Sequence, residues 1–439
     1  MSAKVYIKSF GCQMNAYDAD RMADALRRDL ALERCDRPQD ARVILLNTCS
    51  VREKAQEKLF DELGRLRAFK ERDPRVRIGV GGCVASQEGE RILARAPFVD
   101  VVFGPQTIHR VGALLAARQE RGAAQVDISF PLVEKFDELP AAGRRGPRAF
   151  VSVMEGCSKY CSFCVVPYTR GPEVSRPVLD VLDEVADLAA RGTREVTLLG
   201  QNVNAYLGAD PRGKDADFAR LLACVAGVDG IERIRYTTSH PVNFTAALAA
   251  AHGEIPELMP QVHLPVQSGD DRVLARMKRG HTVLEYRETV RTLRRARPDV
   301  ALTSDFIVGF PGETEEQFAR TVALARWVGY DGGYSFVFSP RPGTPAASFP
   351  DQVPRETQVG RLERLQAELA ASAKRLGEAL LGSRQQVLVE GPAKKGGLLQ
   401  GRLPNNRLAL FAGPAEPGEL RELAVEGLRG GTLRGTLLA

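Results

Sequence analysis

The sequence predicts an α/β protein with three parts: an N-terminal doubly wound parallel sheet, a central partial (β/α)6 barrel and a small C-terminal β-barrel. Three observations lead to this prediction. A length of 439 residues suits about three domains. Strand patterns alternate with helical patterns through the first two parts, and the last part is rich in glycine with shorter apolar periods. With 44% hydrophobic and 26% charged residues, the composition excludes a disordered or collagen-like chain.

The first domain, expected over residues 3–120, alternates strands with helices. Its clearest strand is Val43-Ile44-Leu45-Leu46, an apolar run suited to a parallel strand that is buried on both faces. This alternation predicts a small doubly wound parallel sheet. The expected strands lie at 4–10, 43–46, 77–81 and 99–103, and the helical patterns run through Met22, Ala25 and Leu26 and across 52–72.

The second domain, expected over 143–375 after a linker at 121–142, repeats the alternation on a larger scale. Six strand–helix units predict a partial parallel α/β barrel, whose chemistry gathers at the carboxyl ends of the strands. The expected strands are 150–153, 195–199, 231–236, 261–265, 301–308 and 334–338, with helical patterns such as 178–191, 286–297 and 314–328, and a charged helix at 355–381.

The last domain, expected over 376–439, has the pattern of five short strands in a small barrel. It carries eight basic and six acidic residues. This slight positive excess suits RNA binding, and a purely structural appendage fits nearly as well. The expected strands are 385–390, 398–401, 407–411, 420–425 and 432–437.

Charge and cysteine usage narrow the class of protein. Lys plus Arg number 61 against 55 for Asp plus Glu, and the formal net charge of +6 permits a polyanionic partner without requiring one. No segment approaches the ~20 apolar residues of a membrane span, and the N-terminus has the pattern of a strand rather than a leader. We therefore expect a cytoplasmic protein without membrane association. Its eight cysteines are better explained by metal binding or catalysis than by disulfides.

Three cysteines lie in one short run after the first predicted barrel strand. Cys157, Cys161 and Cys164 have the spacing C-x3-C-x2-C. Closely spaced thiolates on a loop can converge on one soft metal centre, as an iron–sulfur cluster requires. Three protein ligands leave one iron of a four-iron cluster free for an exogenous ligand, which is a catalytic arrangement. The alternatives are a zinc knuckle with a distant fourth ligand and a buried apolar trio.

Three more cysteines are far apart in sequence but occupy equivalent positions. Cys12, Cys49 and Cys83 each follow a predicted strand of the first sheet. The carboxyl ends of parallel strands meet at one edge, where open α/β sheets bind ligands, so these thiolates are expected to share a second cluster. Each cysteine alone would more often be a small buried residue. The remaining two, Cys35 and Cys224, are expected to be structural.

Two further loops at the carboxyl ends of barrel strands are candidate binding sites. Around Gly309, the absence of a side chain lets an adenine or ribose approach the backbone closely. Glu313 is expected either to bind that ligand or to cap the helix that starts near Thr314. Gln201 opens the amide-rich run Gln201-Asn202-Val203-Asn204, which either binds a polar ligand or satisfies the loop backbone. The five histidines form no zinc-type pair, and His263 is expected in the core.

The motifs around these cysteines resemble the radical S-adenosylmethionine (SAM) superfamily and, within it, the methylthiotransferases. The resemblance covers essentially the whole chain. It departs from the family at Ala19 and Asp270, where serine is usual, and neither touches a predicted ligand. The matching segments are Gly11–Asn15, Asn47–Cys49, Gly82–Cys83, Met154–Gly171, Leu199–Val203, Leu264–Gly269, Asp305–Glu313 and Ser339–Pro345.

The resemblance implies an N-terminal methylthiotransferase domain, a radical SAM core and a C-terminal TRAM domain, with two [4Fe–4S] clusters. One cluster would be held by Cys12, Cys49 and Cys83 and associated with the transferred sulfur. The other would be held by Cys157, Cys161 and Cys164 and would bind SAM at its open iron. The implied cofactor contacts beyond the clusters are Gln201, Gly309 and Glu313.

The activity implied by the resemblance is transfer of a methylthio group to carbon 2 of an isopentenylated adenosine beside the anticodon of tRNA. SAM would act both as radical source and as methyl donor. The implied partners are the tRNA anticodon stem-loop and a low-potential electron donor of flavodoxin or ferredoxin type, with the chain a monomer. Relatives acting on threonylcarbamoyl-adenosine or on a ribosomal-protein aspartate are alternatives. An iron–sulfur electron carrier and a zinc-stabilised RNA-binding module are alternatives from other classes.

Overall fold

The computed structural model describes residues 3–50, 55–131, 136, 138, 140, 142–143, 145–394 and 396–438. The first residues of the helix predicted at 52–72, and most of the linker beyond 131, therefore lie outside the described residues. The chain divides into two compact units. The first comprises Met1–Gly143, Met154–Ser158 and Val165–Arg176, and the second comprises Arg144–Val153, Lys159–Cys164 and Pro177–Ala439. The boundaries of the three predicted domains remain a prediction.

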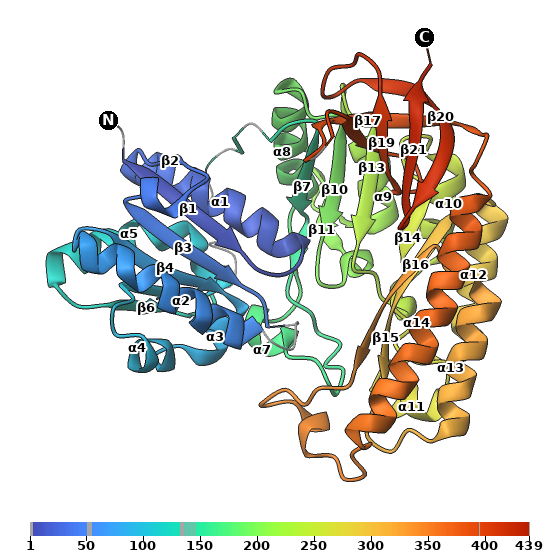
Figure 1. The fold of residues 1–439 in the computed structure, drawn as a ribbon, viewed down its shortest axis with the longest axis horizontal. Helices are drawn as coiled ribbons and strands as arrows, with labels where there is room; N and C mark the ends of the chain where they lie inside the picture. Colours follow the sequence, from blue (N-terminus) through green and yellow to red (C-terminus); the bar gives the residue numbers. More distant parts are fainter. Residues whose placement is uncertain are drawn as a thin grey trace. The chain divides into compact units, whose positions relative to one another are not determined.

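The first unit contains a six-stranded parallel sheet, as the sequence predicts (Figure 1). Its strand order is β2-β1-β3-β4-β5-β6. The short strands β2 and β6 were not predicted, because both lie at the edges of the sheet and their residues are exposed or half-buried without an apolar pattern. The bounds are β1 Lys4–Ser9, β2 Glu33–Arg34, β3 Val43–Thr48, β4 Arg77–Gly82, β5 Val101–Phe103 and β6 Gln125–Asp127.

Helices cover both faces of this sheet, and strand β3 shows why. Its successive side chains point to opposite faces, so that Val43 and Leu45 join the cluster containing α1, whereas Ile44 and Leu46 join the cluster containing α2. Every residue of β3 is buried, as expected for a strand covered on both sides. The helices are α1 Gln13–Leu30, α2 Ala55–Arg72, α3 Cys83–Glu88, α4 Arg91–Arg95 and α5 Val111–Arg121.

The second unit contains the six strands of the predicted partial barrel, arranged as two parallel three-stranded sheets (Figure 1). The orders are β13-β10-β7 and β14-β15-β16, and a single parallel bridge between Ile234 and Leu258 lies near the junction of the two sheets. The bounds are β7 Arg148–Ser152, β10 Glu195–Leu199, β13 Arg233–Thr237, β14 Gln261–His263, β15 Ala301–Val308 and β16 Gly332–Val337.

Each barrel strand is followed by a helix, which completes six strand–helix units. None of the described helices is long and apolar enough to cross a membrane. The helices are α8 Val178–Ala190, α9 Phe218–Ala226, α10 Ala246–Glu254, α11 Asp271–Arg276, α12 Val283–Ala296, α13 Glu315–Val328 and α14 Arg355–Glu378. A hairpin of β11 Leu207–Ala209 and β12 Asp215–Asp217 precedes α9.

The C-terminal strands close into a small barrel in the order β17-β18-β19-β21-β20, which confirms the predicted β-barrel. A buried cluster of Val387, Val389, Phe411, Leu423 and Leu433 fills its interior. Closure leaves this barrel without a free edge strand. The bounds are β17 Arg384–Pro392, β18 Leu399–Arg402, β19 Leu408–Ala412, β20 Leu420–Arg429 and β21 Thr432–Leu437.

Buried arginines join the small barrel to the amino ends of the large-barrel strands. At the start of β13, Arg233 donates hydrogen bonds to the carbonyl oxygen of Arg402 (2.8 Å) and to Gln386 Oε1 (2.9 Å). Arg235 donates to the carbonyl oxygens of Pro404 (2.7 Å) and Leu403 (2.8 Å). The small barrel is therefore docked at the end of the large barrel opposite to the carboxyl ends of its strands.

We expect His252 to make stability fall at acidic pH. Its side chain is fully buried on α10 and lies 2.7 Å from the Tyr236 hydroxyl, and burial lowers the pKa of His252 from 6.5 to about 3. Between these values the unfolded chain binds a proton that the folded chain does not, so the free energy of unfolding falls as pH decreases. In His252→Gln the slope should be shallower by up to about 1.4 kcal/mol per pH unit.

Urea unfolding at a series of pH values from 7 to 4 measures this slope in the wild type and the variant. The other buried histidines contribute equally to both proteins and cancel in the difference. Equal slopes would show that His252 titrates normally in the folded chain.

Candidate functional site

The three dispersed cysteines lie at one edge of the first sheet. Cys12 follows β1 and directly precedes α1, Cys49 directly follows β3, and Cys83 is the first residue of α3 after β4. Because β3 pairs in parallel with both β1 and β4, the three strand ends are neighbours at the carboxyl edge of the sheet. The structure therefore brings these cysteines to the edge that the sequence predicts, and their role as ligands stays a prediction.

The backbone is tightly packed around Cys49. Gly11 has φ +132°, and a Cβ at this position would lie 2.3 Å from the Cβ of Cys49, so only glycine fits. Beside it, Asn47 Nδ2 donates to the carbonyl oxygen of Asn15 (2.7 Å), and Asn15 Nδ2 donates to Asn47 Oδ1 (3.3 Å). These paired amides fix the start of α1 to the end of β3.

A buried ion pair, Arg170 with Asp18, lies close to this edge. A hydrogen bond with Cys49 and, to a smaller extent, the positive charge of Arg170 lower the pKa of the Cys12 thiol to about 6. Arg170 is buried, and its Nη2 donates to Asp18 Oδ2 at 2.6 Å. Since the thiolate is the metal-binding form of cysteine, this environment favours thiolate ligands. Sequence reasoning did not identify Arg170 as part of the site, because the spacing of an arginine does not reveal its burial.

Cys157 lies in a loop that a small antiparallel ladder closes. Strand β8 (Met154–Glu155) pairs with β9 (Val174–Ser175), and the amide of Cys157 donates to the carbonyl oxygen of Gly171 (3.1 Å). The short helix α7 (Val166–Arg170) lies between the two strands. At Gly156, φ is +77°, and a Cβ would lie 1.8 Å from the carbonyl oxygen of Pro172, which excludes any other residue.

Cys161 and Cys164 lie in one tight turn of the second unit. The amide of Cys164 donates to the carbonyl oxygen of Cys161 (3.0 Å). Between them, Ser162 anchors the turn to the end of α11, since its amide donates to Met277 O (3.0 Å) and its hydroxyl donates to Arg276 O (2.8 Å). These contacts of Ser162 hold the turn that carries Cys161 and Cys164 against the end of α11.

The donor chemistry of both cysteine sets fits iron–sulfur clusters better than a single metal ion. Within the part of the chain that the structure describes, no three His, Cys, Asp or Glu side chains converge closely enough to hold one metal ion. A four-iron cluster takes one thiolate per iron, so its ligands are spread around a larger body. Both sets consist of cysteines alone, which is the ligand type of such clusters.

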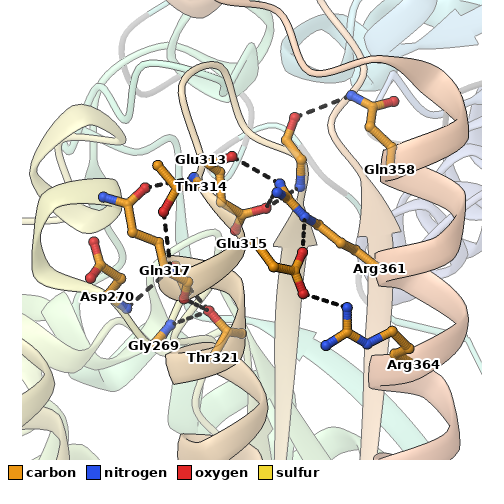
Figure 2. A network of polar contacts seen from close by, with 12 residues as sticks. Gly269, Asp270, Glu313, Thr314, Glu315, Gln317, Thr321, Gln358, Arg361 and Arg364 are labelled. Carbon is orange, nitrogen blue, oxygen red and sulfur yellow. Dashed lines mark hydrogen bonds and ion pairs between the residues drawn. The ribbon is translucent and has the colours of Figure 1, made fainter.

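Glu313, one of the predicted cofactor contacts, lies in a buried network that holds the loop after β15 (Figure 2). Its Oε2 accepts hydrogen bonds from the amide of Gly309 (2.6 Å) and from Arg361 Nη1 (3.0 Å). The carbonyl oxygen of Gly309 accepts a hydrogen bond from Gln358 Nε2 (3.1 Å). Burial raises the pKa of Glu313 to about 7, while its two donors favour the charged form. Two residues of α14 thus fix the backbone of this loop.

The alternative prediction that Glu313 caps the following helix was wrong. The N-cap of α13 is Thr314, whose hydroxyl accepts from the Gln317 amide (3.3 Å), while Gln317 Oε1 accepts from the Thr314 amide (2.9 Å), as Figure 2 shows. This reciprocal capping box pairs backbone N–H groups at the start of α13 without any contribution from Glu313. The Glu313 carboxylate is thereby left to bind Gly309, whose φ of +65° is open to glycine without strain.

In the amide-rich loop after β10, at least one side-chain amide forms hydrogen bonds with backbone groups. Asn204 Nδ2 donates to the carbonyl oxygen of His240 (2.9 Å), and Asn204 Oδ1 accepts from the His240 amide (2.8 Å). Asn202 Nδ2 donates to Asn243 Oδ1 (3.2 Å). Gln201, the predicted cofactor contact, lies two residues beyond the carboxyl end of β10, and its role stays a prediction.

The strands β14, β15 and β16 share a polar and aromatic face. His263 Nδ1 lies 3.0 Å from Thr303 Oγ1, and its Nε2 lies 3.4 Å from Asp305 Oδ1. Tyr334 stands 6.1 Å from the His263 ring, and Tyr334 and Phe336 are 61% and 50% exposed. The expectation that His263 is a core histidine is only partly right, since it is half-buried and bonded to polar neighbours. This face can accept a flat aromatic ligand.

Three family models match the chain in succession. They are the uncharacterized protein family UPF0004 over residues 4–104, the radical SAM superfamily over 151–325 and the TRAM domain over 378–438. The tRNA-2-methylthio-N(6)-dimethylallyladenosine synthase of Burkholderia mallei (strain SAVP1) is 56% identical over 446 residues, which cover 100% of this chain and 98% of that protein. The synthase of the same name from Burkholderia thailandensis is 58% identical over 417 residues, covering 94% and 91%.

Solved structures show the same fold at low identity. The radical SAM methyltransferase TsrM from Kitasatospora setae, with cobalamin and a [4Fe–4S] cluster bound, superposes with a TM-score of 0.59 at 18% identity, covering 79% of this chain and 77% of that one. The cobalamin-dependent SAM radical enzyme OxsB has a TM-score of 0.54 at 12% identity, covering 83% and 56%. These likenesses support the radical SAM fold of the central region.

Removing the partner of buried Glu313 should destabilise the chain strongly. Arg361→Gln leaves the Glu313 carboxylate, whose side chain is fully buried, without its cation, which typically costs about 3–5 kcal/mol. The matched control is Arg364→Gln, because Arg364 is exposed, forms an ion pair with exposed Glu315 and, like Arg361, lies over the Phe318 ring. Loss of that pair should cost less than about 1 kcal/mol.

Urea unfolding of the wild type and both variants measures these free energies. If Arg361→Gln and Arg364→Gln destabilise the chain equally, the buried pair does not hold the loop after β15.

Proposed function

The chain belongs to the family of tRNA-2-methylthio-N(6)-dimethylallyladenosine synthases, and from this membership we propose that it methylthiolates carbon 2 of N(6)-isopentenyladenosine beside the anticodon of tRNA. The observation that carries the proposal is the identity of 56% over the full length of a relative with this name. All three matched regions, including the TRAM domain, follow in the order expected for such an enzyme.

The proposed cofactors are two [4Fe–4S] clusters and SAM. Cys157, Cys161 and Cys164 would hold the cluster that binds SAM, and Cys12, Cys49 and Cys83 would hold the cluster associated with the transferred sulfur. When bound, these groups supply one-electron reductive cleavage of SAM, the sulfur and the methyl group. The lowered pKa of Cys12, to which the charge of Arg170 contributes, supports thiolate ligation by the dispersed set.

The chain's own residues would position the substrates and exclude water. Glu313, Arg361 and Gln358 hold the backbone at Gly309 in one conformation, and this fixed loop is proposed to contact the adenosine part of SAM. The exposed rings of Tyr334 and Phe336 suit an unpaired base, since proteins read loop bases largely by stacking on aromatic side chains. Gln201 is proposed as a further SAM contact at the end of β10.

The proposed partners follow from this chemistry. The tRNA anticodon stem-loop is the substrate, and the TRAM barrel, with its eight basic and six acidic residues, would contact the phosphates. A flavodoxin- or ferredoxin-type protein would supply electrons of low potential. We propose that the chain acts as a monomer in the cytoplasm, where its tRNA substrate is found.

Mass spectrometry of tRNA nucleosides tests the proposed activity. Cells lacking the protein should lose the 2-methylthio-isopentenyl nucleoside and accumulate isopentenyladenosine. Wild type should restore it, Cys161→Ala should not, and the matched control Cys224→Ala should, because Cys224 lies on α9 outside both cysteine sets. An unchanged nucleoside in the deletion strain would overturn the substrate. Loss of a threonylcarbamoyl derivative or of a modified ribosomal-protein aspartate would indicate one of the related activities.

Iron content after anaerobic reconstitution tests the two cysteine sets. The wild type and Cys224→Ala should bind about eight irons per chain, whereas Cys49→Ala and Cys161→Ala should each bind about four. Iron and sulfide analysis, with circular dichroism to verify folding, gives these values. Zinc in place of iron, or four irons in the wild type, would contradict the two-cluster proposal.

A further inference from the structure

Arg279 is a buried cation that contacts one of the proposed cluster ligands. Its side chain follows α11, and the residue is 5% exposed. Nη1 lies 3.5 Å from Cys161 Sγ in donor geometry, and Nη2 donates to the carbonyl oxygen of Pro265 at 2.7 Å. The second contact fixes the orientation of the planar guanidinium, so that its other N–H is aimed at the sulfur.

The surroundings of Arg279 lack the usual counter-ion. Among the residues that the structure describes, no carboxylate lies within ion-pair distance of Arg279. Other buried arginines of the chain face one: Arg170 meets Asp18 at 2.6 Å and Arg235 meets Glu195 at 3.0 Å. A buried cation without a partner is strongly unfavourable. An anion is therefore expected at the position of the Cys161 sulfur.

Neighbouring groups do not provide that anion. The nearby histidine rings belong to His240 and His281, and burial together with the charge of Arg279 lowers their pKa values to about 2 and about 4. Neutral rings neither compensate nor add to the charge. The buried Nε of Arg279 and Nε2 of His240 also have no hydrogen-bond partner. Two buried nitrogen atoms near the Cys161 turn are therefore able to form further hydrogen bonds.

We propose that Arg279 is a positioning residue for the SAM-binding cluster, which donates an N–H to the iron-bound sulfur of Cys161 and makes the cluster easier to reduce. This inference rests on the proposed function, in which Cys161 is a cluster ligand. It adds a residue that neither the cysteine motif nor the SAM-binding loop contains.

Charge balance gives the direction of the effect. A four-iron cluster with three thiolate ligands carries net negative charge in its oxidised form, and one electron from the donor protein increases that charge without making or breaking a bond. A fixed cation inside a low-dielectric environment stabilises the more negative state more strongly. Hydrogen bonds to cluster sulfurs and net charge are established determinants of cluster potential. Loss of Arg279 should thus lower the reduction potential.

An EPR-monitored redox titration tests this direction. The full chain is reconstituted in a Cys49→Ala background, so that the signal comes from the SAM-binding cluster alone. Arg279→Gln should retain about four irons, and its ratio of reduced to oxidised cluster at a fixed potential near the midpoint should fall about tenfold, which corresponds to 59 mV for one electron. The matched control Arg272→Gln removes an exposed arginine of the preceding helix α11 and should leave the midpoint unchanged. An unchanged midpoint in Arg279→Gln would overturn the proposal.

A second measurement remains decisive if Arg279→Gln does not load iron. In protein labelled with ¹⁵N-arginine, pulsed EPR of the reduced cluster should detect a ¹⁵N coupling that disappears in Arg279→Lys. The absence of this coupling in the wild type would refute the contact. If instead the wild type binds no iron or does not cleave SAM, the proposed function fails, which separates the two outcomes.

Discussion

The structure depends on one geometric constraint, namely that parallel strands joined by helices end at a common edge. In the first unit this constraint makes neighbours of Cys12, Cys49 and Cys83, which are far apart in sequence, because β3 pairs with both β1 and β4. In the second unit the same rule places the loop at Gly309 after β15 and Gln201 after β10. Cys12, Cys49, Cys83, Gln201 and Gly309 all lie beyond the carboxyl end of a strand, and the helices between the strands return the chain to the start of the next strand.

The loops at these edges keep their geometry through buried charge rather than through apolar packing. Arg361 and Gln358 reach the Gly309 loop from α14, and Arg170 is tied to Asp18 beneath the cysteine edge of the first sheet. A buried ion pair contributes little net stability compared with an apolar pair, but removal of either partner is costly. Such contacts therefore specify one loop conformation more than they stabilise the fold, which suits loops that must present backbone to a ligand.

Sequence patterns predicted the elements whose apolar residues are regularly spaced. The fully buried β3 and the strand β15, which begins and ends where predicted, are examples. The edge strands β2 and β6 were missed, because their exposed polar residues carry no periodic signal. The candidate cysteines follow from spacing and strand position, whereas Arg170, Arg279 and Arg361 do not. An arginine is usually exposed, and only the tertiary structure reveals that these three are buried beside a predicted site.

Buried arginines also hold the small barrel against the large barrel. Arg235 binds only main-chain carbonyl oxygens of the small barrel, and Arg233 binds main-chain oxygens together with the Gln386 amide. Contacts with main-chain oxygens depend on the path of the backbone and not on the side chains at Leu403 and Pro404. Two side chains of the small barrel also form ion pairs across the junction, Glu390 with Arg148 (2.6 Å) and Arg407 with Asp331 (3.4 Å). The small barrel is thereby attached to the end of the large barrel that is opposite to the carboxyl ends of its strands.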